Sequence, residues 1–202
     1  MTIDVRHDDL VTADVECILR AVSSTLEPVT SLGRAVGAAA GADLAGRIER
    51  IGELPVGGAV ITPGGELRAT FMVHVVVQSP EEPVTASGVR KALLNGLRHA
   101  CRLGVETMAL PPLGTGAGNL DAEVAADVMV SVLRRHLKHE EYPKRVVVMV
   151  SNTYELEAFT ARLGRSDVDL EESSDGAASG RAGASSGVVE WHETGERGEN
   201  GV

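Results

Sequence analysis

A glycine-rich run between residues 110 and 120 has the residue types best suited to binding chemistry in this sequence. It reads Leu-Pro-Pro-Leu-Gly-Thr-Gly-Ala-Gly-Asn-Leu, with glycines at positions 114, 116 and 118. Glycine has no Cβ, so it adopts positive φ readily and leaves neighbouring backbone N–H groups unshielded. Successive unshielded N–H groups before a helix form an anion site, to which the helix dipole adds. The run therefore predicts a site for a phosphate or diphosphate.

A tight strand-to-helix connection that binds nothing explains the same run equally well, because glycine-rich turns commonly join such elements. The run is not followed by the Gly-Lys-Ser/Thr of a Walker loop, and its glycine spacing is not that of a dinucleotide fingerprint. The run by itself leaves both interpretations open.

Polar residues after other expected strands favour the binding interpretation. Asp8 and Asp9 follow a strand expected over 2–5, and Ser23-Ser24-Thr25 follows one expected over 16–22. Ligands of open α/β sheets bind at the carboxyl ends of strands. We expect these two segments and the glycine-rich run to converge on one cleft.

Other side chains capable of chemistry have structural explanations that we favour. Arg20 could pair with an anion in the cleft, but a local ion pair with Asp8, Asp9 or Glu16 accounts for it better. His74 lies in a strand pattern and is expected to be a core or rim histidine with its hydrogen bonds satisfied. The remaining candidates are expected to be small core residues (Cys17 and Cys101) or cations favoured by a helix C-terminus (His136 and His139). No metal site is expected.

Composition limits the class of protein. The chain has 202 residues, a net charge of −10, 43% apolar and 2% aromatic residues. An excess of acid, 29 against 19 basic residues, argues against a duplex nucleic acid or an anionic membrane surface as partner. Two cysteines cannot form a disulfide framework, which suggests a reducing cytoplasm. The sequence shows neither an apolar run of about 20 residues nor a signal-peptide pattern at its start.

Hydrophobic periodicity predicts an α/β sandwich on residues 1–164. Strands alternate with helices, so the sheet should be largely parallel, and a Gly64-Gly65 turn suggests one antiparallel element. Further strands are expected over 60–63, 71–77, 107–110 and 145–150, and helices over 32–51, 86–103, 121–139 and 154–163.

The C-terminal segment, residues 165–202, is expected to be a disordered acidic tail. It is rich in glycine and serine and holds nine acidic against three basic residues. Such a composition cannot bury enough apolar surface to offset the entropy of ordering. The short stretch at residues 188–192, which contains Trp191, could dock an unknown protein. We favour the interpretation that it is an incidental apolar segment with no partner.

Six motifs in order make the chain resemble a macro domain, the module that binds ADP-ribose, over about residues 3–163. Asp8-Asp9-Leu10 stands where that family has Gly-Asp-Ile, and residues 15–24 stand where it has Val-Asp-Ala-Ile-Val-Asn-Ala-Ala-Asn-Ser. The others are Ala39-Ala40-Gly41 with Leu44, residues 58–64, His74-Val75-Val76, and Pro112 to Gly118, which is similar to the family's second phosphate loop.

The resemblance implies a three-layer α/β/α sandwich over a mixed six-stranded sheet, with no cofactor. It implies that Asp9 accepts a hydrogen bond from the adenine amino group and that Leu10 lies beside the ring. It places Ser23 near the distal ribose. The backbone of Gly114, Thr115, Gly116, Ala117 and Gly118 would hold the diphosphate.

Departures from the family pattern bear on catalysis. The family's two asparagines are Arg20 and Ser23 here, and its first, glycine-rich loop is Val29-Thr30-Ser31-Leu32. The aspartate of the hydrolytic branch is Gly33, which cannot act as a general base. The family's next histidine is Gly37, and Ser151 stands where an aromatic residue commonly stacks on adenine.

The expected function is therefore a module that binds ADP-ribose, a related nucleotide diphosphate or an ADP-ribosylated target, without efficient hydrolysis. Two alternatives remain: a hydrolase of O-acetyl-ADP-ribose or of ADP-ribosylated protein, and an interaction scaffold that has lost its ligand. No catalytic residue is assigned.

Overall fold

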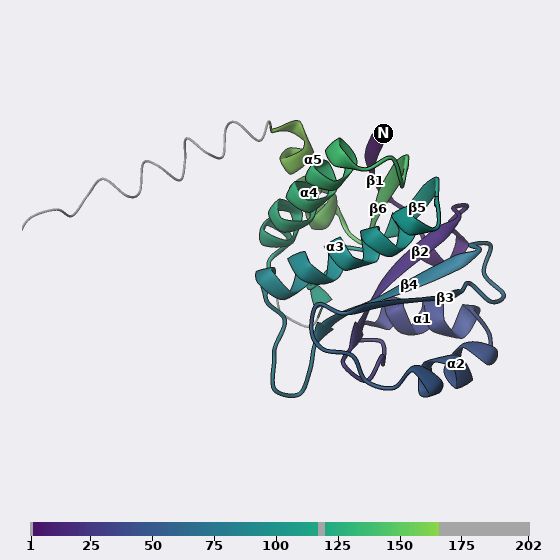
Figure 1. Cartoon of the computed structure of the whole chain (residues 1–202). Coiled ribbons are helices and arrows are strands. Elements are labelled where there is room, and N and C mark those ends of the chain that lie inside the picture. The colour runs from purple at the N-terminus through teal and green to yellow at the C-terminus, as the bar shows by residue number, and fades with distance from the viewer. Residues whose placement is uncertain (1, 117–119, 166–202) are drawn as a thin grey trace, which may run out of the picture. The chain divides into compact units, whose positions relative to one another are not determined.

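The structure is a computed structural model that describes residues 2–116 and 120–165. Its centre is a six-stranded sheet in the order β1-β6-β5-β2-β4-β3 (Figure 1). Every neighbouring pair is parallel except β3 and β4, which are antiparallel around the Gly64-Gly65 turn. The mixed sheet is confirmed. The strands are β1 (Thr2–His7), β2 (Cys17–Ser23), β3 (Ala59–Pro63), β4 (Phe71–Gln78), β5 (Thr107–Leu110) and β6 (Arg145–Val150).

Helices cover both faces of the sheet, so the three-layer sandwich is confirmed. One face packs against α3 (Ala86–Arg102), α4 (Ala122–His139) and α5 (Thr153–Gly164). The other packs against η1 (Leu10–Thr12), α1 (Ser31–Ala39) and α2 (Asp43–Ile51). Alternation along β2 divides the core: Leu19 faces the first layer and Ile18 the second, both fully buried.

The single helix expected over 32–51 is wrong, because the chain breaks it into α1 and α2. Gly41 follows Ala40, the C-cap of α1, and takes a φ of +89°, a conformation that glycine adopts without steric cost. The carbonyl oxygen of Ala40 then accepts a hydrogen bond from the Glu66 N–H at 3.1 Å. The two helices consequently diverge and leave space between them.

Parallel pairing brings four carboxyl ends to one edge of the sheet. Strands β1, β6, β5 and β2 lie side by side and run in the same direction. The segments that follow them begin at Asp8, Ser151, Pro111 and Ser24. The strand ends share one edge of the sheet, as expected, but the expected convergence on one cleft is wrong for Ser23, Ser24 and Thr25, which line neither hollow described below.

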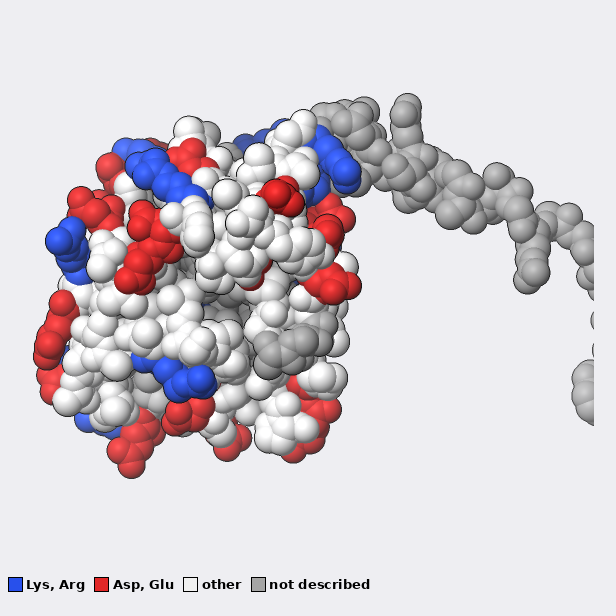
Figure 2. Space-filling model, turned by 180° about the vertical axis from the view of Figure 1, so that it is seen from behind, with Lys and Arg blue, Asp and Glu red and all other residues white. Residues whose placement is uncertain are grey.

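The surface of the described residues carries both signs of charge. Figure 2 shows one face, hollowed near its centre, where neutral residues cover most of the middle and acidic and basic side chains are interspersed around them. Among the described residues, no helix is long and apolar enough to cross a membrane. The tail expected over 165–202 lies, apart from Arg165, outside the described residues.

Candidate functional site

The corner after β1 presents a carboxylate. One side-chain oxygen of Asp9, Oδ1, accepts a hydrogen bond from the Val11 N–H at 2.9 Å and caps η1. The backbone N–H of Asp9 donates to Asp8 Oδ1 at 2.8 Å. Within the part of the chain that the structure describes, Asp9 Oδ2 has no such partner. That oxygen can therefore accept a further hydrogen bond from a ligand.

A hollow of about 390 Å³ opens beside this corner. It is lined by His7, Asp8, Asp9, Leu32, Met149, Val150 and Ser151. Its apolar lining residues are Leu32, Met149 and Val150. Leu10, which the resemblance places beside the base, is 1% exposed and packs into the core instead. A flat ring in this hollow would therefore contact Leu32, Met149 or Val150 in place of Leu10.

A second hollow of about 250 Å³ adjoins the first. The two share Leu32, Met149 and Ser151, so they are parts of one groove. The second is lined by Ala21, Thr30, Ser31, Leu32, Pro111, Pro112, Gly114, Thr115, Gly116, Met149, Ser151, Asn152 and Glu155. The glycine-rich loop therefore faces the groove, as the sequence predicts, although Ala117 and Gly118 lie outside the described residues.

Gly114 sets the start of the glycine-rich loop. Its φ is +85°, and its carbonyl oxygen accepts the Leu120 N–H at 2.9 Å, which closes the loop. A Cβ there would lie 3.0 Å from both Leu120 Cδ1 and Val84 Cγ1. Positive φ and close packing together require glycine at this position.

The segment before α1 narrows the groove. Thr30 caps α1, because its hydroxyl oxygen accepts the Gly33 N–H at 2.9 Å. Its methyl group faces the opposite loop, where a Cβ at Gly116 would lie 2.7 Å from Thr30 Cγ2. Thr30 therefore leaves no room for a side chain at position 116, and a void of about 250 Å³ remains beside the loop.

Glu155 is not among the site residues expected from the sequence, yet it joins two walls of the groove. Its carboxylate is 7% exposed; Oε1 accepts from the Thr115 hydroxyl, and Oε2 accepts from the N–H and hydroxyl of Ser151, each at 3.0 Å. The sequence signal that could have indicated it is the Asn-x-x-Glu pattern of a capping box. Asn152 does cap α5, accepting the Glu155 N–H at 2.9 Å.

Ser23 and Tyr154 lie away from the groove's lining. The Ser23 hydroxyl bonds to Thr25 Oγ1 at 2.9 Å. Tyr154 is 54% exposed, and its hydroxyl donates to Glu123 on α4. The structure therefore brings Asp9, Gly114, Thr115 and Gly116 to the groove, but not the Ser23 side chain.

The local ion pair expected for Arg20 is wrong. Arg20 is 2% exposed; its Nε donates to His74 Nδ1 at 3.0 Å and its Nη1 to the Gly33 carbonyl oxygen at 3.0 Å. It lies on β2 beside His74 of β4, whereas Asp8 and Asp9 follow the more distant β1. A Cβ at Gly37 would lie 2.4 Å from Arg20 Nη1, so glycine at 37 makes room for the guanidinium.

The prediction of a satisfied core histidine at position 74 is confirmed. His74 is fully buried, and its Nε2 bonds to the Thr62 hydroxyl at 2.9 Å. Since Nδ1 accepts from Arg20, the proton of the neutral ring is on Nε2. Burial, with the positive charge of Arg20 added, lowers the pKa of His74 to about 3. The ring is therefore neutral at pH 7 and acts as a fixed acceptor.

The described residues hold no cluster of three side chains that could bind a metal ion. In the groove, Glu155 already accepts three hydrogen bonds, and Gly33 offers no side chain. The lining offers an acceptor at Asp9 and apolar walls at one end, and the loop residues Gly114, Thr115 and Gly116 at the other.

Comparison with known proteins identifies the family. The family model described as "Macro domain" matches residues 20–129, more than half of the chain. This protein belongs to the macro domain family. An O-acetyl-ADP-ribose deacetylase of Enterobacter cloacae is 30% identical over 175 residues, covering 84% of this chain and 97% of its own.

Solved macro domains share the fold at lower identity. The Oceanobacillus iheyensis macrodomain with ADP is 18% identical with a TM-score of 0.73, over 83% of this chain and 91% of that one. The Trypanosoma brucei macrodomain in complex with ADP-ribose is 16% identical, also with a TM-score of 0.73, over 80% of this chain and 69% of that one.

Proposed function

We propose that this macro domain binds ADP-ribose, or a closely related nucleotide diphosphate, in the groove between Asp9 and the glycine-rich loop, without efficient hydrolysis. The observation that carries the proposal is the continuity of the two hollows, with a carboxylate acceptor at one end and the loop of Gly114 and Gly116 at the other. An adenine nucleotide diphosphate carries a donor amino group on its base at one end and an anionic diphosphate further along. The two ends of the groove offer those partners in the same order.

The chemistry of the lining supports binding over turnover. Hydrolysis needs a group that orients or deprotonates water near the scissile bond. Position 33 has no side chain, Glu155 is committed to Thr115 and Ser151, and Asp9 lies at the opposite end of the groove from the loop.

A second candidate function is the hydrolysis of an ADP-ribose ester. The observation in its favour is the 30% identity to a protein named O-acetyl-ADP-ribose deacetylase. If a phosphate of the ligand itself orients the attacking water, hydrolysis needs few protein groups. The absence of the family's asparagines and aspartate therefore does not exclude this activity. We propose an ADP-ribosylated protein as a further binding target for the same groove.

Calorimetric titration with ADP-ribose, ADP and AMP tests the proposal, alongside melting temperatures measured with each ligand. ADP-ribose should stabilise the fold by RT ln(1 + [L]/Kd), and AMP should bind more weakly because it lacks the second phosphate. An unchanged melting temperature at millimolar ADP-ribose would leave an interaction scaffold as the function. Release of free ADP-ribose or acetate from a modified carrier, above a buffer control, would establish the hydrolase instead.

A further inference from the structure

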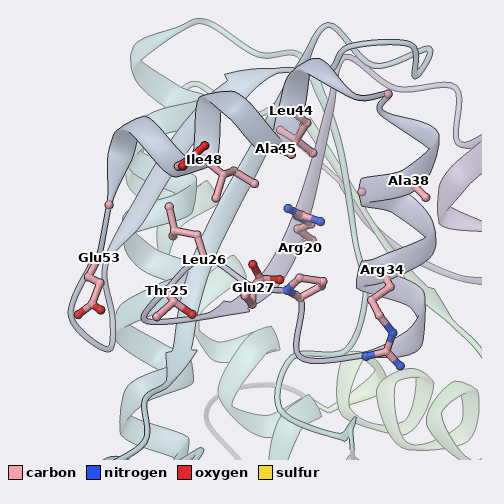
Figure 3. A pocket seen from close by; sticks show the side chains of 15 residues that line it. Arg20, Thr25, Leu26, Glu27, Arg34, Ala38, Leu44, Ala45, Ile48 and Glu53 are labelled. Atoms are coloured by element: carbon pink, nitrogen blue, oxygen red, sulfur yellow. The ribbon is translucent and has the colours of Figure 1, made fainter.

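A cavity separate from the groove lies between α1, α2 and the segment 25–28 (Figure 3). Its volume of about 710 Å³ is within the ~300–1,000 Å³ typical of small-molecule sites. None of its lining residues lines either hollow of the groove. The divergence of α1 and α2 at Gly41 provides this space.

The walls of the cavity are mainly apolar. Leu44, Ala45 and Ile48 of α2 line one side, and Leu26 lies across from them (Figure 3). Leu26 is fully buried with a φ of +64°, a strained conformation for a residue with a Cβ. Hydrogen bonds from the Leu26 N–H to the Ser23 oxygen and from the Ser23 N–H to the Glu27 oxygen hold this turn in place.

One buried cation reaches the cavity. Arg20 extends from β2 into the space between the two helices, where Figure 3 shows its guanidinium facing the lining residues. A guanidinium has five N–H donors in a planar fork. Two of them are used, by His74 and by Gly33, and the described residues provide Arg20 with no further hydrogen bond. Three donors remain, one on Nη1 and two on Nη2, and an end-on carboxylate would engage one on each nitrogen.

The charges around the opening restrict the ligand. Glu27, Glu49 and Glu53 are exposed residues of the lining, and Glu27 interacts electrostatically with Arg20; Arg34 is the one other cation among the lining residues. The acidic side chains would repel a multiply charged anion such as a diphosphate. A ligand with a single carboxylate carries less negative charge than a diphosphate, so these acidic side chains would repel it less as it approaches Arg20.

We propose that this cavity binds a small organic monocarboxylate with an apolar body, whose carboxylate pairs with Arg20 while the body packs against Leu44 and Ile48. The site is independent of the groove and of the ADP-ribose proposal. It takes a ligand of different chemistry through a different face of α1.

Hexanoate and its neutral counterpart hexanamide test the proposal as a matched pair. In NMR titrations of the full chain, hexanoate should shift the amides of α1 and α2 saturably, and hexanamide should bind roughly tenfold more weakly or worse, the ratio expected when charged hydrogen bonds are lost. Equal affinity of the two probes, or no saturable shift with hexanoate at millimolar concentration, would overturn the proposal.

Ala45→Phe fills the cavity from α2 without changing a charge or a hydrogen-bonding side chain. It should abolish hexanoate binding, whereas Ala35→Phe, at an exposed position of α1 outside the lining, should leave it unchanged. Retained hexanoate binding in Ala45→Phe would place the probe elsewhere and reject the cavity.

ADP-ribose titrations of the same variants separate the two proposals. ADP-ribose should bind wild type and Ala45→Phe equally and should not displace hexanoate. Displacement of hexanoate by ADP-ribose would mean that the two ligands share a site, and it would reject a separate cavity site. A chain that binds hexanoate but not ADP-ribose would reject only the nucleotide proposal.

Discussion

The carboxylate of Glu155 accepts a hydrogen bond from the Thr115 hydroxyl at 3.0 Å, across 40 residues of sequence. Its second oxygen holds Ser151 at the end of β6. One buried side chain thus connects the glycine-rich loop with the strand end beside the Asp9 corner. The same carboxylate brings a negative charge close to the position proposed for a diphosphate.

Two substitutions of Glu155 should separate these effects. Glu155→Ala leaves the Ser151 N–H without its partner and should cost about 1–3 kcal/mol of unfolding free energy as well as ADP-ribose affinity. Glu155→Gln keeps a carbonyl oxygen for Ser151 and removes the charge, so it should bind ADP-ribose at least as tightly as wild type. Denaturant unfolding and calorimetry measure both quantities, with exposed Glu157→Gln as control. Weaker binding in the glutamine variant would show that the charge itself assists the ligand.

Asp9→Asn should weaken ADP-ribose binding by about 1.5–3 kcal/mol, the range for a hydrogen bond to a charged group. The asparagine can still cap η1 through its oxygen, but it presents an N–H₂ donor where the adenine amino group needs an acceptor. Asp14→Asn makes the same charge change at an exposed position outside the groove lining and should have no effect on calorimetric affinity. Equal affinity of the two variants would remove Asp9 from the site.

Gly114→Ala should destabilise the fold and weaken ADP-ribose binding together. Alanine at a φ of +85° costs roughly 1–2 kcal/mol, and its Cβ would also press on Leu120 and Val84. Gly104 has a φ of +65° with open space around it, so Gly104→Ala isolates the backbone cost. Thermal unfolding should show a larger loss at 114 than at 104, and only the former should affect the ligand.

Gly37→Ala should lower the unfolding free energy by about 1–3 kcal/mol, because its Cβ displaces the Arg20 guanidinium from His74 and the Gly33 oxygen. Gly46→Ala, also within a helix, meets only Arg50 Nη1 at 3.9 Å and should gain roughly 0.5–1 kcal/mol. Urea unfolding compares the two. A stabilised Gly37→Ala would mean that Arg20 relocates without loss.

Lowering the pH should destabilise the protein through His74. Its pKa falls from an ordinary 6.5 to about 3 in the folded chain. Below pH 6.5 the ring is therefore protonated in the unfolded chain but stays neutral in the folded one. The contribution of His74 to the unfolding free energy is therefore fully present above pH 6.5. It is lost as the pH falls, with a limiting slope of about 1.4 kcal/mol per pH unit. Unfolding measured between pH 7 and 5 should show this decline in wild type and in the exposed-histidine control His139→Gln, but not in His74→Gln.

The amino-acid sequence by itself predicted that the glycine-rich loop and the Asp9 corner lie at the same edge of the sheet, where they line adjoining hollows. Glycine spacing reports where the backbone can turn and expose N–H groups, and parallel strands deliver their carboxyl ends to a common edge. These are local or topological properties, so a linear pattern encodes them. The break at Gly41 is also a local property. The apolar periodicity continues on both sides of it, so the sequence predicted one helix where the structure has two.

Tertiary packing alone decided the partners of Arg20 and Glu155. Which side chains meet Arg20 depends on β4, and not β1, lying beside β2, and Glu155 meets Thr115 because β5 and β6 are neighbours. Strand neighbours are set by how all the apolar faces bury together, which no short window of sequence contains. The same global packing spreads α1 from α2 and opens the cavity that Arg20 enters.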